Sequence, residues 1–270
     1  AHDKIHWLIK SNSVASDSMN ASDIIASGEL DHAEHLIELS EKAQQRDVNI
    51  IVPSSDVLLK TLNVPAKSTR AIRLAAPYML EDEFAEEVEQ LFFAYHTPPT
   101  KESAHNCYTA IVSHKQMQQW LTWLAQANIV SHSFLPEVLA MPIAESSWSA
   151  IAIGESQPQV IVRQNYWQGF TIDNPTWQLQ CQALQSKSQQ SETGDSVALT
   201  EDESQQNVTI DAYSSLPNSN ELTINPMPEE LPLALLAKHY QQSKFNLLQG
   251  QYKVKDSQSK FSKQWLLVAG

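Results

Sequence analysis

The order of apolar runs in the first 64 residues constrains the fold more than any other feature of the sequence. Two apolar runs come before a predicted helix and two come after it. Within that helix, Ala33, Leu36 and Ile37 share one face. Asp31 with Glu34 predicts a capping box at the start of that helix. Strands, a helix and further strands outline a ribonuclease-H-like half-domain, although many α/β modules share this outline. The runs that we interpret as strands cover residues 5–9, 24–25, 49–52 and 57–62.

The pattern changes between Thr69 and His132. The spacing predicts a helix over 69–80, strands over 91–95 and 107–112, and a second helix. The second helix carries an apolar stripe that belongs to the core, at positions i, i+3, i+4 and i+7. The stripe consists of Met117, Trp120, Leu121 and Leu124.

The second half of the chain predicts a β-rich segment, a polar insertion and a closing helix. Residues 150–172 indicate a hairpin. Gln185 to Asn207 consists mainly of Gln, Ser, Glu and Asp and predicts a mobile loop. A helix is expected from about 231 to 248.

Composition excludes several classes of protein. The net charge of -13 argues against a general nucleic-acid binder, because neutralising phosphates requires a basic surface. Cys107 and Cys181 are the only cysteines, too few for a disulfide framework, which fits a reducing compartment. No run of 18 apolar residues occurs, so we expect no membrane span within these 270 residues.

Phosphate chemistry lacks its usual signatures. Phosphate-binding turns of actin-like ATPases use glycine for close backbone approach and place an aspartate two residues before it. The chain has six glycines, and none follows an aspartate at that spacing. A Walker-type loop is also absent. We therefore expect nucleotide hydrolysis to be lost. The pairs at this spacing include Ala26 with Gly28, Ala152 with Gly154, and Trp167 with Gly169.

Other catalytic constellations are weak. His32, His35 and Glu38 share a helical face and could hold a metal, although spaced polar residues on an exposed helix are more often solvated. No Gly-x-Ser-x-Gly elbow occurs, and neither cysteine has catalytic neighbours. We expect no catalytic residue, no cofactor and no metal, and hence no enzyme.

An acidic segment follows the first predicted helix of the 69–132 region. Its carboxylates repel one another and lie where the helix macrodipole prefers cations. They form either a solvated acidic face or a docking surface for a basic partner, and a catalytic carboxylate pair has little support. The candidate partner-binding residues are Glu81, Asp82, Glu83, Glu86, Glu87 and Glu89.

The C-terminal tail is basic in an acidic protein. From Ser243 onward it holds five lysines and one aspartate and reaches an apolar run at 265–268. This is typical either of a basic C-terminal strand or of the cytoplasmic approach to a membrane span that would continue past Gly270. The candidate membrane-proximal residues are Lys253, Lys255, Lys260, Lys263 and Trp265.

Three segments together resemble the L protein family of the type II (general) secretion system. They are Leu74-Ala-Ala-Pro-Tyr-Met-Leu-Glu-Asp-Glu-Phe-Ala-Glu-Glu-Val-Glu89, Leu135-Pro-Glu-Val-Leu-Ala-Met-Pro142 and Ser243-Lys-Phe-Asn-Leu-Leu-Gln-Gly250, in the order that the family has. The resemblance covers nearly the whole chain. Ala152 departs from nucleotide-binding relatives, which have an Asp-Ile-Gly turn there.

The resemblance implies a mixed α/β fold of the actin-like ATPase superfamily, with two ribonuclease-H-like subdomains and an inserted small α+β module. Subdomain I would comprise 1–66 and 134–147, the inserted subdomain II 67–133, and subdomain III 148–252, including the mobile loop 185–207. Residues 253–270 would form a juxtamembrane segment and the start of a transmembrane helix.

The resemblance also implies a function. Such a chain is the cytoplasmic domain of a single-pass bacterial inner-membrane protein, a non-catalytic platform scaffold. It recruits the secretion ATPase, the E protein, through the N-terminal domain of that ATPase, and associates with the M protein and with itself as a dimer. The alternatives are an active actin-like nucleotide-binding ATPase and a soluble regulator without a membrane tie.

Overall fold

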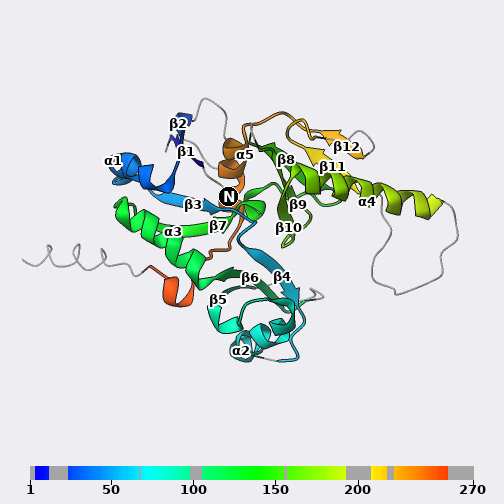
Figure 1. The fold of residues 1–270 in the computed structure, drawn as a ribbon, viewed down its shortest axis with the longest axis horizontal. Helices are drawn as coiled ribbons and strands as arrows, with labels where there is room; N and C mark the ends of the chain where they lie inside the picture. Colours follow the sequence, from blue (N-terminus) through cyan, green and yellow to red (C-terminus); the bar gives the residue numbers. More distant parts are fainter. Residues whose placement is uncertain are drawn as a thin grey trace, which may run out of the picture.

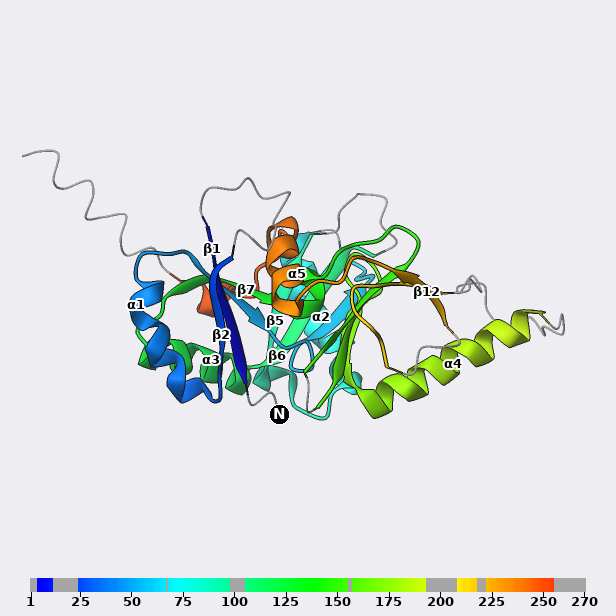
Figure 2. The same ribbon diagram turned by 90° about the horizontal axis from the view of Figure 1, so that it is seen from above.

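The computed structural model describes residues 4–11, 24–66, 68–97, 105–154, 157–192, 208–217 and 222–254. These residues form a mixed α/β structure with four sheets (Figure 1). The sheets gather around a central core, whereas α4 extends away from it (Figure 2).

Two small sheets form the first part of the fold. β1 (Ile5–Lys10) pairs antiparallel with β2 (Ile24–Leu30). β3 (Val48–Val52) pairs in parallel with β7 (Ser131–Pro136), although nearly eighty residues separate them. The intervening chain must therefore leave this part of the fold and return to it, as an inserted module does.

The helix predicted after Asp31 takes another form. Residues Ala33–Leu39 are a 3-10 helix (η2), and only Ser40–Ala43 are α-helical (α1). The N-cap position falls on His32, and no side chain caps the helix there. The predicted capping box is therefore wrong, because a capping side chain acts from the N-cap position itself.

The intervening chain builds a three-stranded antiparallel sheet, β4-β6-β5, at the bottom of Figure 1. Ser68 and Ser113 cap the two helices of this module by accepting from backbone N–H groups three residues on. The helices and strands of this module agree closely with the two helices and the strands predicted for this part of the sequence. They are β4 (Leu58–Leu62), α2 (Thr69–Met79), the 3-10 turns η3 (Glu81–Glu83) and η4 (Val88–Gln90), β5 (Leu91–His96), β6 (Cys107–Ser113) and α3 (His114–Gln126).

The two faces of the β4-β6-β5 sheet pack against different helices. Phe92 and Val112 point to the central core together with Met117 and Trp120 of α3. Side chains on the other face, such as Cys107, pack against α2. Alternation along each strand thus separates a core face from an α2 face.

The second half of the chain forms a five-stranded sheet of order β10-β9-β8-β11-β12. Three antiparallel strands are followed by two strands parallel to the first, so the predicted hairpin is a three-stranded meander. The strands are β8 (Trp148–Ile153), β9 (Gln159–Arg163), β10 (Gly169–Asp173), β11 (Thr209–Ala212) and β12 (Thr223–Pro226).

Two predictions on helices in this half need correction. α4 covers Asn174–Glu192, so the first residues of the expected mobile loop are helical. Trp177 and Cys181 of α4 pack against the five-stranded sheet, and this burial stabilises the polar helix that follows them. Residues 193–207 lie outside the described part. The closing helix, α5 (Pro232–His239), is shorter than predicted and passes into a 3-10 turn, η6 (Tyr240–Gln242).

Residues 243–254, which we call the C-terminal strap, run back across the core as extended chain with one 3-10 turn, η7 (Gly250–Tyr252). Asn246 accepts from the N–H of Phe134 at 3.1 Å and donates to the C=O of His132 at 2.8 Å. Gln249 bonds in the same way to Tyr95 on β5. Two side-chain amides thus hold the strap to two different sheets.

Trp167, in the turn between β9 and β10, joins three parts of the fold. Its indole N–H lies 3.1 Å from the C=O of Lys60 and 3.3 Å from the C=O of Thr109, both in the β4-β6-β5 sheet. His96 of β5 stacks on its ring at 5.2 Å between centroids, and Phe245 of the strap meets it edge-on at 5.0 Å. The turn, the inserted sheet and the strap therefore share one aromatic cluster.

The predicted subdomain boundaries stay a prediction. β4 ends before residue 67 but pairs with β6 of the inserted region, and β7 begins before residue 134. Of the predicted juxtamembrane segment 253–270, only Lys253 and Val254 are described.

Candidate functional site: an acidic surface beside a sheet-end hollow

The acidic segment leaves the C-terminus of α2 and leads into β5. It contains the two 3-10 turns, and its six carboxylate side chains are all exposed. Leu80 and Val88 anchor it, with 1% and 7% of their surface exposed. The carboxylates are therefore displayed from a segment that is fixed at both ends.

Two contacts hold the acidic segment against the α2 face of the β4-β6-β5 sheet. The ammonium of Lys60 on β4 pairs with the carboxylate of Glu83. The ring of Phe84 meets that of Phe93 on β5 edge-on, with 6.2 Å between centroids. Of the six candidate partner-binding residues, Glu83 is thus already engaged within the chain. Whether the other five bind a partner stays a prediction.

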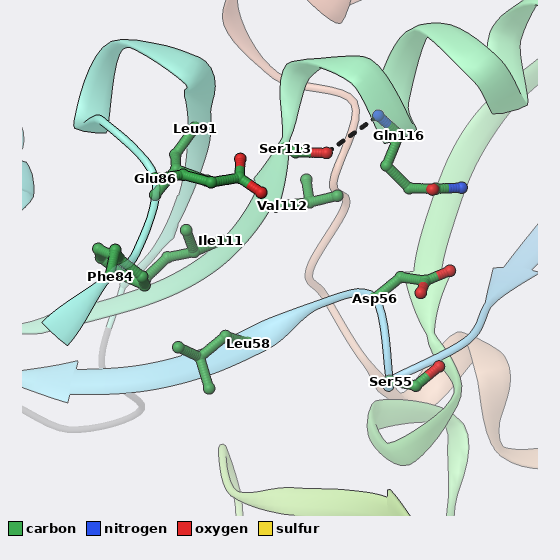
Figure 3. A pocket seen from close by; sticks show the side chains of 10 residues that line it. All are labelled: Ser55, Asp56, Leu58, Phe84, Glu86, Leu91, Ile111, Val112, Ser113 and Gln116. Atoms are coloured by element: carbon green, nitrogen blue, oxygen red, sulfur yellow. Dashed lines mark hydrogen bonds between the residues drawn. The ribbon is translucent and has the colours of Figure 1, made fainter.

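A hollow of about 310 Å³ opens beside this segment at one end of the β4-β6-β5 sheet (Figure 3). We call it the sheet-end hollow. Three stretches of chain form it: the loop that enters β4, the acidic segment, and the junction of β6 with α3. Its lining residues are Ser55, Asp56, Leu58, Phe84, Glu86, Leu91, Ile111, Val112, Ser113 and Gln116.

The strand register explains why the hollow forms there. Leu58 pairs with Ile111, and Leu91 with Ser113, so the beginnings of β4 and β5 lie beside the end of β6. α2 covers the opposite end of this face, and Phe84 covers its middle. The near end remains partly open, which leaves Leu58 44% exposed.

The turn after β8, where nucleotide-binding relatives would have their Asp-Ile-Gly turn, carries no carboxylate at the position of the aspartate. Ala152 stands there, and its N–H donates to the hydroxyl of Ser214 at 2.8 Å. Gly154 follows with φ +78°, and a Cβ on it would lie 2.9 Å from the C=O of Gln157. Glycine here serves the backbone conformation of the turn.

The possible metal set lies on η2 and its N-cap. The rings of His32 and His35 are 6.0 Å apart between centroids and tilted by 53°. Within the described ranges, no group of three or more His, Cys, Asp or Glu side chains is placed to hold a metal ion.

The candidate membrane-proximal residues lie mostly outside the described part. Lys253 directly follows η7, whereas Lys255, Lys260, Lys263 and Trp265 are not described. Among the helices that the structure does describe, none combines the length and the apolar character that crossing a membrane requires.

The sequence interpretation missed a buried cation. Arg163, at the end of β9, is 5% exposed. Its guanidinium donates to the C=O groups of Leu139 and Met141 at 2.8 and 2.7 Å, and to those of Asn165 and Tyr166. Burial lowers the pKa of Arg163 to about 10. Its partners are backbone carbonyls, so no acidic residue in the sequence signals this contact.

The fold is that of the actin-like ATPase class, which confirms the predicted fold class. Over 93% of its length the chain is similar to a solved structure, the cytoplasmic domain of EpsL, an inner membrane component of the type II secretion system of Vibrio cholerae. The TM-score is 0.69, the identity is 26%, and 94% of that chain is covered.

The chain belongs to the type II secretion system protein L family, as its three motifs indicated. The model of this family, described as type II secretion system (T2SS), protein L, matches residues 1–255. The chain is 28% identical to the type II secretion system protein L of Vibrio cholerae over 252 residues, and 34% identical to that of Dickeya chrysanthemi over 103 residues. These alignments cover 93% and 38% of this chain, and 57% and 25% of the two relatives. The chain thus spans little more than half of the first relative.

Proposed function

We propose that this chain, a component of the type II secretion system, is a non-catalytic scaffold at the inner membrane that recruits and orients the secretion ATPase. The observation that carries the proposal is the display of carboxylates between the buried anchors Leu80 and Val88. A docking surface that is already ordered loses less conformational entropy on binding. Its charge would attract a basic face of the partner and raise the rate of encounter.

The mechanism of such a scaffold is thermodynamic. Holding the motor at the membrane raises its local concentration and fixes its orientation relative to the other platform proteins. We include a single membrane span beyond the described residues, association with the M protein and a homodimer in this proposal. The family membership and the basic C-terminal tail support these parts.

Calorimetric titration of this chain with the N-terminal domain of the cognate secretion ATPase tests the proposal. We expect saturable 1:1 binding at micromolar affinity or better, weakening as salt screens the carboxylates. Absence of a complex at low salt, with both proteins folded, would remove recruitment as the function.

The second candidate function is that of an active actin-like ATPase, and the shared fold favours it. The scaffold is preferred because Ala152 occupies the position where that mechanism needs an aspartate to orient Mg²⁺ and water. Titration with Mg-ATP distinguishes the two: binding together with phosphate release would replace the scaffold proposal with the enzymatic one.

A further inference from the structure

We propose that the sheet-end hollow is a socket for a Lys or Arg side chain that a protein partner presents beside an apolar residue. The inference deepens the proposed function, because the hollow adjoins the acidic segment; only the identity of the partner rests on that function. It concerns the chemistry of one contact point, which can be tested without the secretion ATPase.

The hollow offers apolar surface to an incoming side chain. Leu58, Phe84 and Leu91 line it, and Leu58 is 44% exposed. Ile111 lies beside Leu58 on the neighbouring strand and is only 3% exposed, so the surface beneath the opening is already well packed. An aliphatic stem placed against Leu58 would remove apolar area from water without any rearrangement of the core.

The charge around the opening is negative. Asp56 and Glu86 lie on different sides of the hollow (Figure 3), and the lining residues that the structure describes include no Lys, Arg or His. Within the described residues, Glu86 has no ion-pair partner. Glu87 and Glu89 add exposed negative charge next to it.

Among the described residues, the nearest cations leave the charge of Glu86 in place, whereas Asp56 already has an interaction within the chain. Lys60 pairs with Glu83 and is therefore engaged on the same sheet face. Lys115 is exposed on α3 beside the lining residue Gln116 but does not line the hollow itself. The α3 N-terminus carries partial positive charge, and the hydroxyl of Ser113 already caps it by accepting from the N–H of Gln116 at 3.1 Å.

These features together select the class of occupant. Lys and Arg combine an apolar stem with a cationic head, which matches a hollow with apolar walls and the exposed carboxylate of Glu86 at its rim. Glu86, with Glu87 and Glu89 next to it, would repel a phosphate or an anionic lipid surface. We therefore assign the hollow to a basic, partly apolar protein segment.

A dipeptide probe tests the socket directly. The full chain, isotope-labelled, is titrated with N-acetyl-leucyl-arginine amide while the backbone amide resonances are followed by NMR. We expect saturable shifts at Leu58, Glu86 and Gln116, at millimolar affinity, and no saturable shift with N-acetyl-leucyl-glutamate amide. Equal responses to both peptides, or no response at these residues, would overturn the proposal.

Two variants link the socket to recruitment. Glu86→Gln removes the rim charge, and Leu58→Lys supplies a cation from the chain itself that occupies the hollow. Each should weaken binding of the secretion ATPase by about tenfold, because Glu86→Gln removes the carboxylate that the basic side chain would contact and Leu58→Lys competes with that side chain for it. Glu41→Gln, at an exposed glutamate on α1, is the matched control and should leave binding unchanged.

The two proposals fail in different ways. Binding of the ATPase that both socket variants leave unchanged would overturn the socket but keep recruitment. Selective binding of the arginine dipeptide without binding of the ATPase would support the socket and overturn recruitment. Unfolding profiles that match the parent chain confirm that either loss is local, since Leu58 and Glu86 are exposed.

Discussion

The side chain of Gln249 pairs with the backbone of Tyr95 through both of its polar atoms. Its Oε1 accepts from the N–H of Tyr95 at 3.1 Å, and its Nε2 donates to the C=O of Tyr95 at 2.9 Å. The amide thereby takes the place that a neighbouring strand would have at the edge of β5. An edge strand closed in this way presents fewer free backbone groups for pairing with another chain.

Replacing Gln249 by Ala should lower the free energy of unfolding by about 2 kcal/mol, because both backbone groups of Tyr95 lose their partner in a half-buried position. Urea unfolding measures this loss. Gln251→Ala provides the control on the same strap, since Gln251 is exposed and, among the described residues, its side chain bonds to the ring of His114 at 3.1 Å. An equal loss in the two variants would show that the pairing with Tyr95 contributes nothing specific.

Removing the guanidinium of Arg163 should be more costly. Arg163→Met keeps much of the side-chain volume but leaves four carbonyl groups without their donors. We expect a loss of about 3 kcal/mol in thermal or urea unfolding. Arg163→Lys retains the charge but has fewer donors. Its stability should therefore lie between that of the parent chain and that of the methionine variant. A methionine variant as stable as the parent chain would mean that the guanidinium is replaceable by apolar packing.

The stability of the fold should depend on pH through His96. Burial lowers the pKa of His96, which stacks on Trp167 and bonds to the hydroxyl of Tyr166 at 2.7 Å. The folded state thus favours the neutral ring. This contribution to stability is complete above about pH 6.5, the ordinary pKa of histidine, and is lost as the pH falls toward the lowered value.

His96→Phe keeps an aromatic ring in the stack and removes the titrating group. The variant should be less stable near pH 7.5 by about 1 kcal/mol, since the hydroxyl of Tyr166 loses its partner. Its stability should also decline less than that of the parent chain between about pH 7 and 5. Urea midpoints across this range decide the question, and parallel curves would assign the acid sensitivity to other groups.

Charge reversal in the acidic segment should weaken recruitment of the secretion ATPase. Glu81→Lys, Asp82→Lys and Glu87→Lys together should lower its affinity by about tenfold at low salt and flatten the dependence on salt. A matched control reverses Glu34, Glu38 and Glu41 on η2 and α1, which changes the net charge equally. Equal losses in the two triple variants would indicate a general effect of charge and no local docking surface.

Elements with a clear apolar period were predictable from the sequence. The predicted helix over 69–80 and the strand over 107–112 agree with α2 and β6 to within a residue. The polar end of α4 was not predictable from the sequence. The helix is stabilised by Trp177 and Cys181, which pack on a sheet formed by distant residues. β11 and β12 have four residues each, too few to establish an alternating pattern.

The candidate site was predictable only in part. A run of six carboxylates within nine residues predicts an exposed segment, and all six side chains are exposed. Their surroundings depend on contacts between distant residues. Glu83 meets Lys60 across 23 positions, and the hollow needs Leu58 and Ile111 to be paired. Nothing in the local sequence specifies these pairings, because strand register is set by the assembled sheet.

The position of Trp167 has a consequence for how force would travel through this molecule. Rotating the five-stranded sheet against the inserted sheet would pull the indole N–H away from the carbonyls of Lys60 and Thr109. It would also separate the Trp167 ring from Phe245, at the root of the strap. Tension applied along the strap would therefore act on the five-stranded sheet and on the β4-β6-β5 sheet at the same time. The two sheets would then move together and not rotate against each other.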